Sequence, residues 1–364
     1  MKKLLTIILS VLLLLTSCGR EEKVDTVEKE YAEGYETARR NNNWSNLNLN
    51  GMFYFVDRAD FMSPQLWFFD FDSMKSAIMC ARPNCPHDDP DVCTAFEVLG
   101  WICHPTIVEN NLYFFRYRYE WDKDEKLHNY QDIYKAELDG SSRVKIDTLD
   151  DIDYIQDLVM KGSVAYFTTI VEENEPHTGV ATGNGETYIC SYDFINKEYN
   201  KWQLTDYPAL PSILGEYNGG LYIRDYNSIF LRFDLETGEI TDWDMPLSSI
   251  NEYDAYKPMF ASGGYYGYMD GDNAVIVDSE GNEMVFENYE LPDNIAVLPV
   301  NGYFFNTDGT AIDLSTGEIL EINKGVIPKY NYVLCYHDGS YIIHGLGSNF
   351  KKVPEDEMFK RSEP

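Results

Sequence analysis

The chain has 364 residues with a formal net charge of −32, and aromatic residues make up 15% of it. A negative charge of this size repels nucleic acid and anionic lipid surfaces, which excludes nucleic acid as a partner. The length suffices for one large domain or two ordinary ones. The many Tyr and Phe side chains are typical of short, half-buried β-strands.

The first residues have the pattern of a bacterial export signal. Two lysines at positions 2 and 3 precede an apolar run over residues 4–15, which is too short to span a bilayer as a stable helix. The run ends in Leu-Thr-Ser-Cys18, which resembles the lipobox of bacterial lipoproteins. That resemblance implies cleavage before Cys18 and attachment of diacylglycerol to its thiol. An ordinary secretory signal with a chance cysteine is the alternative.

We therefore expect a lipoprotein signal peptide over residues 1–17, followed by a spacer over 18–45. The spacer is charged and rich in Asn, with little strand alternation. Lipid on Cys18 would make the membrane a partner and place the protein outside the cytoplasmic membrane, tethered rather than spanning. In a Gram-negative source the outer membrane is the alternative location.

From about residue 46 one unit recurs along the chain, and residues 218–239 show it most clearly. A glycine turn opens an aromatic strand, and a second strand ends in Asp-Leu-x-Thr-Gly-Glu at 234–239, a motif that returns at 313–318. The aromatic strand aligns seven times, at spacings of 37 to 59 residues and about 48 on average. Its aromatic positions are Tyr54, Tyr113, Tyr166, Tyr222, Tyr266, Phe304 and Tyr341.

The repeated unit predicts an all-β protein. Four short antiparallel strands per unit, with no helical spacing of apolar residues between them, favour a β-propeller of about seven four-stranded blades, with six or eight as alternatives. The propeller domain is expected over residues 46–354 and a C-terminal tail over 355–364. Each blade buries its faces only against its neighbours, so the ring must be nearly complete before it is stable.

A cysteine-rich segment separates the first two units. Besides Cys18 the chain has six cysteines, and four of them lie between residues 80 and 103. The residues concerned are Cys80, Cys85, His87, Cys93 and Cys103. Cys80, Cys85, His87 and Cys93 together fit a tetrahedral zinc or iron-like site. Two disulfides among the four cysteines fit equally well, because an exported location favours them.

The second and third units carry extra residues at the same point, around 119–130 and 172–186. Strands alternate in direction within a blade, so these insertions and the cysteine segment are expected on one face of the ring. We expect that face to bind a protein or glycan; disordered, solvated loops are the alternative. The candidate binding residues are Tyr119, Trp121, His128, Tyr130 and His177.

No catalytic residue stands out, so the sequence favours a binding protein over an enzyme. It contains neither a Gly-x-Ser-x-Gly elbow nor a phosphate-binding Gly-rich loop. One alternative is a carbohydrate-active hydrolase or lyase with acids in the central channel; another is a scaffold whose cysteine segment senses metal or redox state. Four acids recur at strand-to-turn junctions and are expected to cap those turns: Asp70, Asp193, Asp234 and Asp313.

Residues 132–142, with their counterparts in the first, third and fourth units, resemble strands of TolB-type and low-density-lipoprotein-receptor-type propellers. The chain is similar in particular to lipid-anchored bacterial propellers of unknown function that are related to this receptor class. Its segment 80–93 is similar to a cysteine/histidine motif in lipoproteins of anaerobic gut bacteria. The Tyr-Trp-Thr-Asp signature of the receptor class is absent. The resemblance implies a fold and a location, not a reaction.

Overall fold

The chain divides into two units, Met1–Glu33 and Gly34–Pro364, and every residue described by the computed structural model belongs to the second. For a few of these residues, Cys103 among them, the side chain is not described. The described residues are 45–48, 51–56, 65–80, 82–87, 93, 95, 102–124, 126–138, 140–150, 152–174, 181–205, 211–224, 230–243, 260–287, 289, 299–306, 309–323, 325–327, 332–344 and 350–360.

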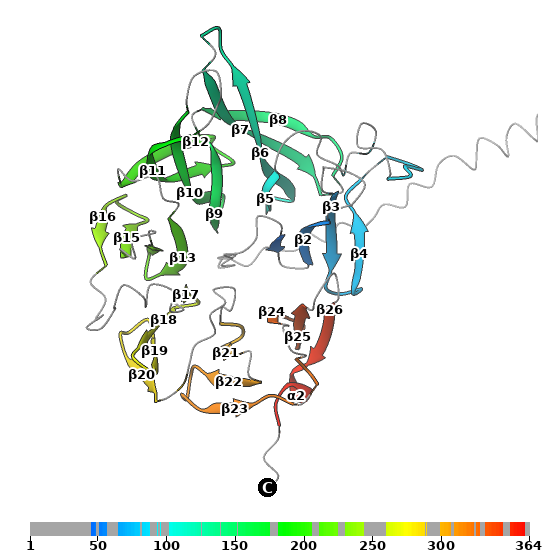
Figure 1. Cartoon of the computed structure of the whole chain (residues 1–364). Coiled ribbons are helices and arrows are strands. Elements are labelled where there is room, and N and C mark those ends of the chain that lie inside the picture. Colours follow the sequence, from blue (N-terminus) through cyan, green and yellow to red (C-terminus); the bar gives the residue numbers. More distant parts are fainter. Residues whose placement is uncertain are drawn as a thin grey trace, which may run out of the picture. The chain divides into compact units, whose positions relative to one another are not determined.

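The strands form consecutive antiparallel sheets, the blades of the fold (Figure 1). Blade one contains β1 (Ser45–Asn48), β2 (Gly51–Val56), β3 (Gln65–Asp70) and β4 (Lys75–Ile78). Blade two contains β5 (Ile102–Val108), β6 (Asn111–Trp121), β7 (Leu127–Glu137) and β8 (Val144–Asp150). Blade three contains β9 (Tyr154–Lys161), β10 (Val164–Asn174), β11 (Ala181–Asp193) and β12 (Glu198–Thr205). In each blade the strands are hydrogen-bonded in sequence order.

Blades four and five also have four strands each and are joined into one eight-stranded sheet by a parallel bridge, whereas blades six and seven have three strands each among the described residues. Blade four contains β13 (Ser212–Tyr217), β14 (Gly220–Arg224), β15 (Phe230–Asp234) and β16 (Ile240–Asp242). Blade five contains β17 (Phe260–Ser262), β18 (Tyr265–Asp270), β19 (Asn273–Val277) and β20 (Glu283–Phe286). Blade six contains β21 (Tyr303–Phe305), β22 (Thr310–Asp313) and β23 (Ile319–Glu321). Blade seven contains β24 (Tyr332–His337), β25 (Ser340–His344) and β26 (Phe350–Pro354).

The seven aromatic positions of the sequence repeat fall one to a blade. They lie in β2, β6, β10, β14, β18, β21 and β25. An all-β propeller with seven blades is therefore confirmed. Among the described residues no helix is long and apolar enough to cross a bilayer.

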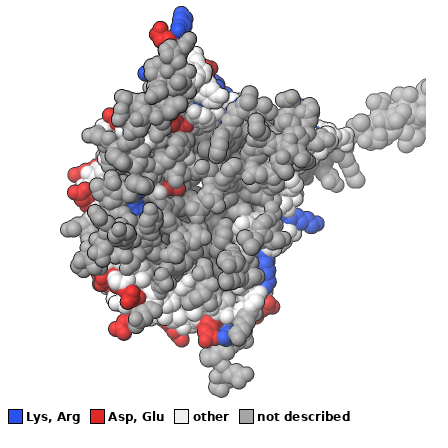
Figure 2. All heavy atoms as spheres, viewed as in Figure 1, with Lys and Arg blue, Asp and Glu red and all other residues white. Residues whose placement is uncertain are grey.

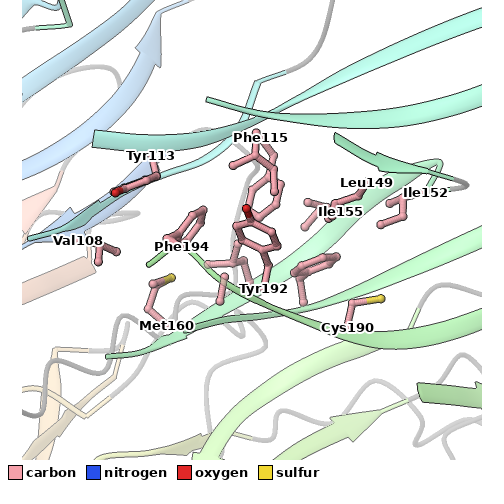
Figure 3. Close-up of a cluster of buried hydrophobic side chains, with 14 residues drawn as sticks. Val108, Tyr113, Phe115, Leu149, Ile152, Ile155, Met160, Cys190, Tyr192 and Phe194 are labelled. Atoms are coloured by element: carbon pink, nitrogen blue, oxygen red, sulfur yellow. The ribbon is translucent and has the colours of Figure 1, made fainter. Parts of the chain in front are cut away.

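Strands near the middle of a blade are buried on both faces, and β6 shows why. Its residues 112–115 are all buried. Leu112 and Phe114 pack with blade one, whereas Tyr113 and Phe115, which point the other way, pack with blade three. Figure 3 shows the second of these cores, where rings from β6 meet Tyr192 and Phe194 of blade three. Because both faces are covered, such strands contain continuous apolar runs rather than alternating ones.

A hydrophobic cluster joins each blade to the next, and one more closes the ring. The pairs that represent these clusters are Phe53 with Phe114, Phe115 with Phe167, Ile189 with Leu221, Tyr222 with Val275, Phe260 with Phe304, Phe305 with Tyr341, and Ile342 with Phe69. The last pair connects blade seven to blade one. At this closure the Phe69 and Phe350 rings stack with centroids 3.8 Å apart.

The chain after blade seven folds back onto blade six. The short helix α2 (Glu355–Met358) follows β26 directly. Phe359 then bridges antiparallel to Ile322, and the Lys360 N–H donates to the Glu321 carbonyl at 3.0 Å. Residues 355–360, which the sequence analysis placed in a tail, therefore extend the outer edge of blade six.

Candidate functional site

Four side chains of the cysteine segment converge at the connection between blades one and two. The thiols of Cys80, Cys85 and Cys93 and a ring nitrogen of His87 all lie within 4.8 Å of one another. Cys80 comes two residues after β4, and the other three belong to the loop that follows. The group is close enough to bind one metal ion, which is one of the two arrangements that the sequence allowed.

Backbone geometry and hydrogen bonds hold this loop in place. Asn84 and His87 have left-handed φ angles of 56° and 57°, a conformation that Asn and His adopt more readily than most residues. The carbonyl of His87 accepts a hydrogen bond from Gln65 Nε2 at 2.8 Å. The N–H of Leu66 donates to the carbonyl of Ala95 at 3.0 Å. Both parts of the segment are thus attached to the beginning of β3.

Cys80, Cys85 and Cys93 are not joined in disulfides. Cys93 is buried, and burial raises the pKa of its thiol to about 12. The Nδ1 atom of His87 lies 3.3 Å from Cys93 Sγ. Cys103, the fourth cysteine of the disulfide alternative, lies in β5 opposite Phe115, and its side chain is outside the description.

The first insertion is a regular β-hairpin rather than a loop. β6 and β7 pair without interruption from Asn111–Glu137 to Trp121–Leu127, so residues 119–121 and 127–130 continue the strands of blade two. Figure 1 shows this hairpin projecting beyond the other blades. β5 begins opposite Arg116, in the middle of β6, and runs away from the hairpin turn to Val108, opposite Asn111. The chain therefore enters blade two from the side of the hairpin turn.

The hairpin has an aromatic face and a charged face. Tyr117, Tyr119 and Trp121 alternate along β6 and therefore share a face. This face continues the one that packs against blade three through Phe115. The side chains of Tyr119 and Trp121 are 59% and 46% exposed, which is unusual for residues so large.

The other face carries His128 and Tyr130. The Arg118 guanidinium lies over the Tyr130 ring, 4.3 Å from its centroid, and its Nε donates to Asp132 Oδ2 at 3.1 Å. Burial works against ionisation of Asp132, yet hydrogen bonds from Thr148 and Arg118 keep its pKa below the ordinary value. His128 pairs with Asp122 in the turn at 3.0 Å.

The structure thus brings Tyr119 and Trp121 together and separates them from His128 and Tyr130. His177, the fifth candidate, lies outside the described residues. Blade three has a comparable extension, in which β10 and β11 pair through Glu172–Gly185 and Asn174–Ala181. Acidic and basic side chains both appear at the projecting end of the hairpin (Figure 2).

The repeated acids cap turns, as predicted. Asp234 Oδ1 accepts hydrogen bonds from the N–H groups of Glu236 and Thr237 at 3.1 and 2.9 Å. Donation from the Thr237 backbone and hydroxyl lowers the pKa of Asp234 to about 2. The turns after Asp70, Asp193 and Asp313 are capped in the same way. These carboxylates therefore have a structural role in four of the seven blades.

A small cavity lies between blades three and four, and the sequence did not predict it. The cavity has a volume of about 250 Å³. It opens near the start of β10 and the end of β11, which are the strand ends furthest from the turn that joins these two strands. Three aromatic and three acidic side chains contribute to its lining: Tyr166, Trp202, Phe233, Asp193, Glu198 and Glu236. No sequence signal marks it, because its residues come from two separate repeats.

His104 in blade two predicts a loss of stability in acid. His104 Nε2 is sealed from solvent without a hydrogen-bond partner, and burial lowers the pKa of the side chain to about 4. The unfolded chain takes up this proton near pH 6.5, so it binds more protons than the folded chain between pH 6.5 and 4. We expect the free energy of unfolding to fall across this window by up to about 3 kcal/mol.

Urea denaturation at pH 7, 5.5 and 4 would measure this effect in the wild type and in a His104→Asn variant. Asn tolerates the left-handed backbone at this position, where φ is 55°. The variant should lose this part of the pH dependence, whereas contributions from other groups should remain in both proteins. Equal pH dependence in the two proteins would contradict the assignment to His104.

Comparison with known proteins found similar solved structures but no matching family. No protein-family model matches the chain, and no curated protein matches it in sequence. TolB from Acinetobacter baumannii is 10% identical over 85% of this chain, with a TM-score of 0.38, and the match spans 62% of TolB. The propeller domain of the Trilobed protease from Pyrococcus furiosus is 12% identical over 85% of this chain and 90% of its own, with a TM-score of 0.43.

A third similar structure is the acylaminoacyl peptidase of Pyrococcus horikoshii. It is 13% identical over 85% of this chain and 49% of its own, with a TM-score of 0.46. At such low identities the similarity concerns the fold alone. The protein is a β-propeller, and this assignment rests on the order of its sheets and on the closed series of inter-blade cores.

Proposed function

We propose that the protein is a lipid-anchored, extracytoplasmic propeller that binds a protein or glycan through the face carrying the β6–β7 hairpin. The observation that carries this proposal is the exposed aromatic pair, Tyr119 and Trp121, on an ordered hairpin. The export signal and the lipobox-like ending at Cys18 support the location. A tethered protein with a projecting binding element can meet ligands that diffuse outside the membrane.

Contact with a ligand would bury apolar surface that the hairpin leaves in water. Fully burying an aromatic side chain removes roughly 150–250 Å² from solvent, at about 25 cal/mol per Å². About half of the Tyr119 and Trp121 surfaces is exposed, so each side chain can contribute on the order of 2–3 kcal/mol to binding. Trp and Tyr are enriched among the residues that dominate protein interfaces.

The regular pairing of the hairpin favours binding in a second way. A disordered loop would lose conformational freedom when a ligand orders it, and that loss reduces affinity. Here β6 and β7 are paired up to Trp121 and Leu127, and Arg118, Tyr130 and Asp132 interlock on the opposite face. The aromatic face is therefore largely ordered before a ligand arrives.

A double variant, Tyr119→Ala with Trp121→Ala, tests the proposal. We expect at least a hundredfold loss of affinity, because each lost contact contributes on the order of 2 kcal/mol and every 1.4 kcal/mol corresponds to about tenfold. Binding would be measured on arrays of glycans and of extracytoplasmic proteins. Val285→Ala, which removes a side chain 55% exposed on blade five, is the matched control. Unchanged binding by the double variant would defeat the proposal.

A carbohydrate-active enzyme is the second candidate, and the cavity between blades three and four favours it. Carboxylates from two blades line this cavity together with Trp202. Asp193 already caps its own turn, which leaves Glu198 and Glu236 for acid–base chemistry. Release of reducing ends from polysaccharides, abolished in Glu198→Gln and Glu236→Gln variants, would support an enzyme. Wild-type protein inactive on a broad polysaccharide panel would count against it.

A further inference from the structure

We propose that Cys80, Cys85, His87 and Cys93 bind one structural zinc ion, which fastens the connection between blades one and two to β3. This inference goes beyond ligand binding by the hairpin and does not depend on it. Three thiolates and one imidazole are a donor set that proteins use for closed, tetrahedral zinc sites. All four donors come from within 14 residues of the chain, and their ligand atoms lie within 4.8 Å of one another.

The position of the His87 ring shows which of its two nitrogens would bind the ion. His87 Nδ1 lies 3.3 Å from Cys93 Sγ, so Nδ1 is the donor on the inner side. The left-handed backbone at Asn84 and His87 bends the loop on either side of Cys85. These two turns bring Cys85 and His87 towards Cys80 and Cys93, which precede and follow them.

A disulfide explains the convergence of these four side chains less well than a zinc ion does. Three thiols can form only one disulfide, which would leave one thiol and the imidazole at the same point without a role. The fourth cysteine, Cys103, lies in β5, ten residues further along the chain than Cys93. One zinc ion uses all four side chains and releases the thiol protons to solvent as it binds.

The surroundings indicate a structural rather than a catalytic ion. Four protein donors leave no open coordination position for a substrate. Gln65, itself buried, donates to the His87 carbonyl, and the Leu66 N–H donates to Ala95 beyond Cys93. The ion would therefore link the end of blade one, through Cys80, to a loop that is already attached to β3.

Metal content of the purified full chain tests the proposal directly. The chain would carry an affinity tag without histidine and be prepared in detergent without chelators. We expect elemental analysis to find about one zinc per chain in the wild type. In the Cys93→Ser and His87→Ala variants the zinc content per chain should be at least tenfold lower. Even changes outside the ligand set cost roughly 10–100-fold in metal affinity. Cys335→Ser, at a cysteine of blade seven outside the proposed site, is the matched control and should keep its zinc.

Two further measurements keep the proposal falsifiable if a variant folds poorly. Cobalt bound to the wild type should give the visible absorption of a tetrahedral, thiolate-ligated ion. A strong chelator should make three additional thiols reactive while the circular dichroism of the β-sheets persists. Absence of zinc from the wild type, iron or copper in its place, or a disulfide between any two of Cys80, Cys85 and Cys93 in peptide maps would overturn the assignment.

Discussion

A Gly215→Ala variant should lose more than about 4 kcal/mol of unfolding free energy, the range in which single substitutions are exceptional. Gly215 lies in β13 with φ 142°, and a Cβ at this position would be 1.6 Å from the carbonyl oxygen of Ala261. The contact is between two backbones, at the single parallel bridge that joins β13 to β17. No side-chain rotation can relieve it, so blades four and five would have to separate.

Thermal unfolding followed by circular dichroism would measure this loss. Gly263→Ala is the control, because Gly263 also has a positive φ, 60°, but no atom lies within 4 Å of its expected Cβ. The control should lose only about 1–2 kcal/mol from the strained backbone. Equal losses in the two variants would show that the close approach of β13 and β17 does not exist in solution.

Removing the Phe69 ring is expected to weaken the closure between the first and last blades. Phe69 is buried with Met52, Leu334 and Ile342, and its ring stacks on that of Phe350. Large-to-small changes of buried Phe typically cost about 3–5 kcal/mol. A Phe69→Ala variant should therefore unfold more easily by this amount, and blade seven should be the first to lose its protection.

Hydrogen exchange resolved by blade would distinguish this outcome from general destabilisation. Amides of β24, β25 and β26 should exchange faster than those of β13–β16, which lie far along the ring from the closure. Phe69→Leu keeps most of the buried volume and should cost much less. Uniform acceleration across the blades, or a loss below about 1 kcal/mol in Phe69→Ala, would contradict closure through this cluster.

Several features could be predicted because their signals are local. A glycine turn before an aromatic strand and an acid before a tight turn act within a few residues, so each copy can be recognised separately. Asp234 and Asp313 cap their turns as the repeated motif indicates. The resemblance to receptor-type propellers and the lipid on Cys18 stay predictions, since no described residue bears on them.

The insertion in blade two shows why other features could not be predicted. Charged residues such as Arg118 and Glu120 alternate with aromatic ones, and such a stretch can be a polar loop or an exposed hairpin. Pairing with β7 decides between them, since Tyr119 opposes Asn129 and Trp121 opposes Leu127. The spacing of Cys80 to Cys93 likewise fitted metal and disulfide equally, and only the fold shows that His87 and three thiols lie close together.

The sequence by itself determined the repeated strand-and-turn unit, its seven copies and the capping role of its acids, because these depend on contacts between near neighbours. Only the tertiary structure decided how the ring closes, where residues 355–360 pack, and which donors of the cysteine segment meet. These depend on contacts between residues far apart in the chain or on the path of a loop that no short motif encodes. The exposure of the hairpin's aromatic face was also decided only by the tertiary structure. Phe115 on this face is buried against blade three, whereas Tyr119 and Trp121 further along the same face remain in water.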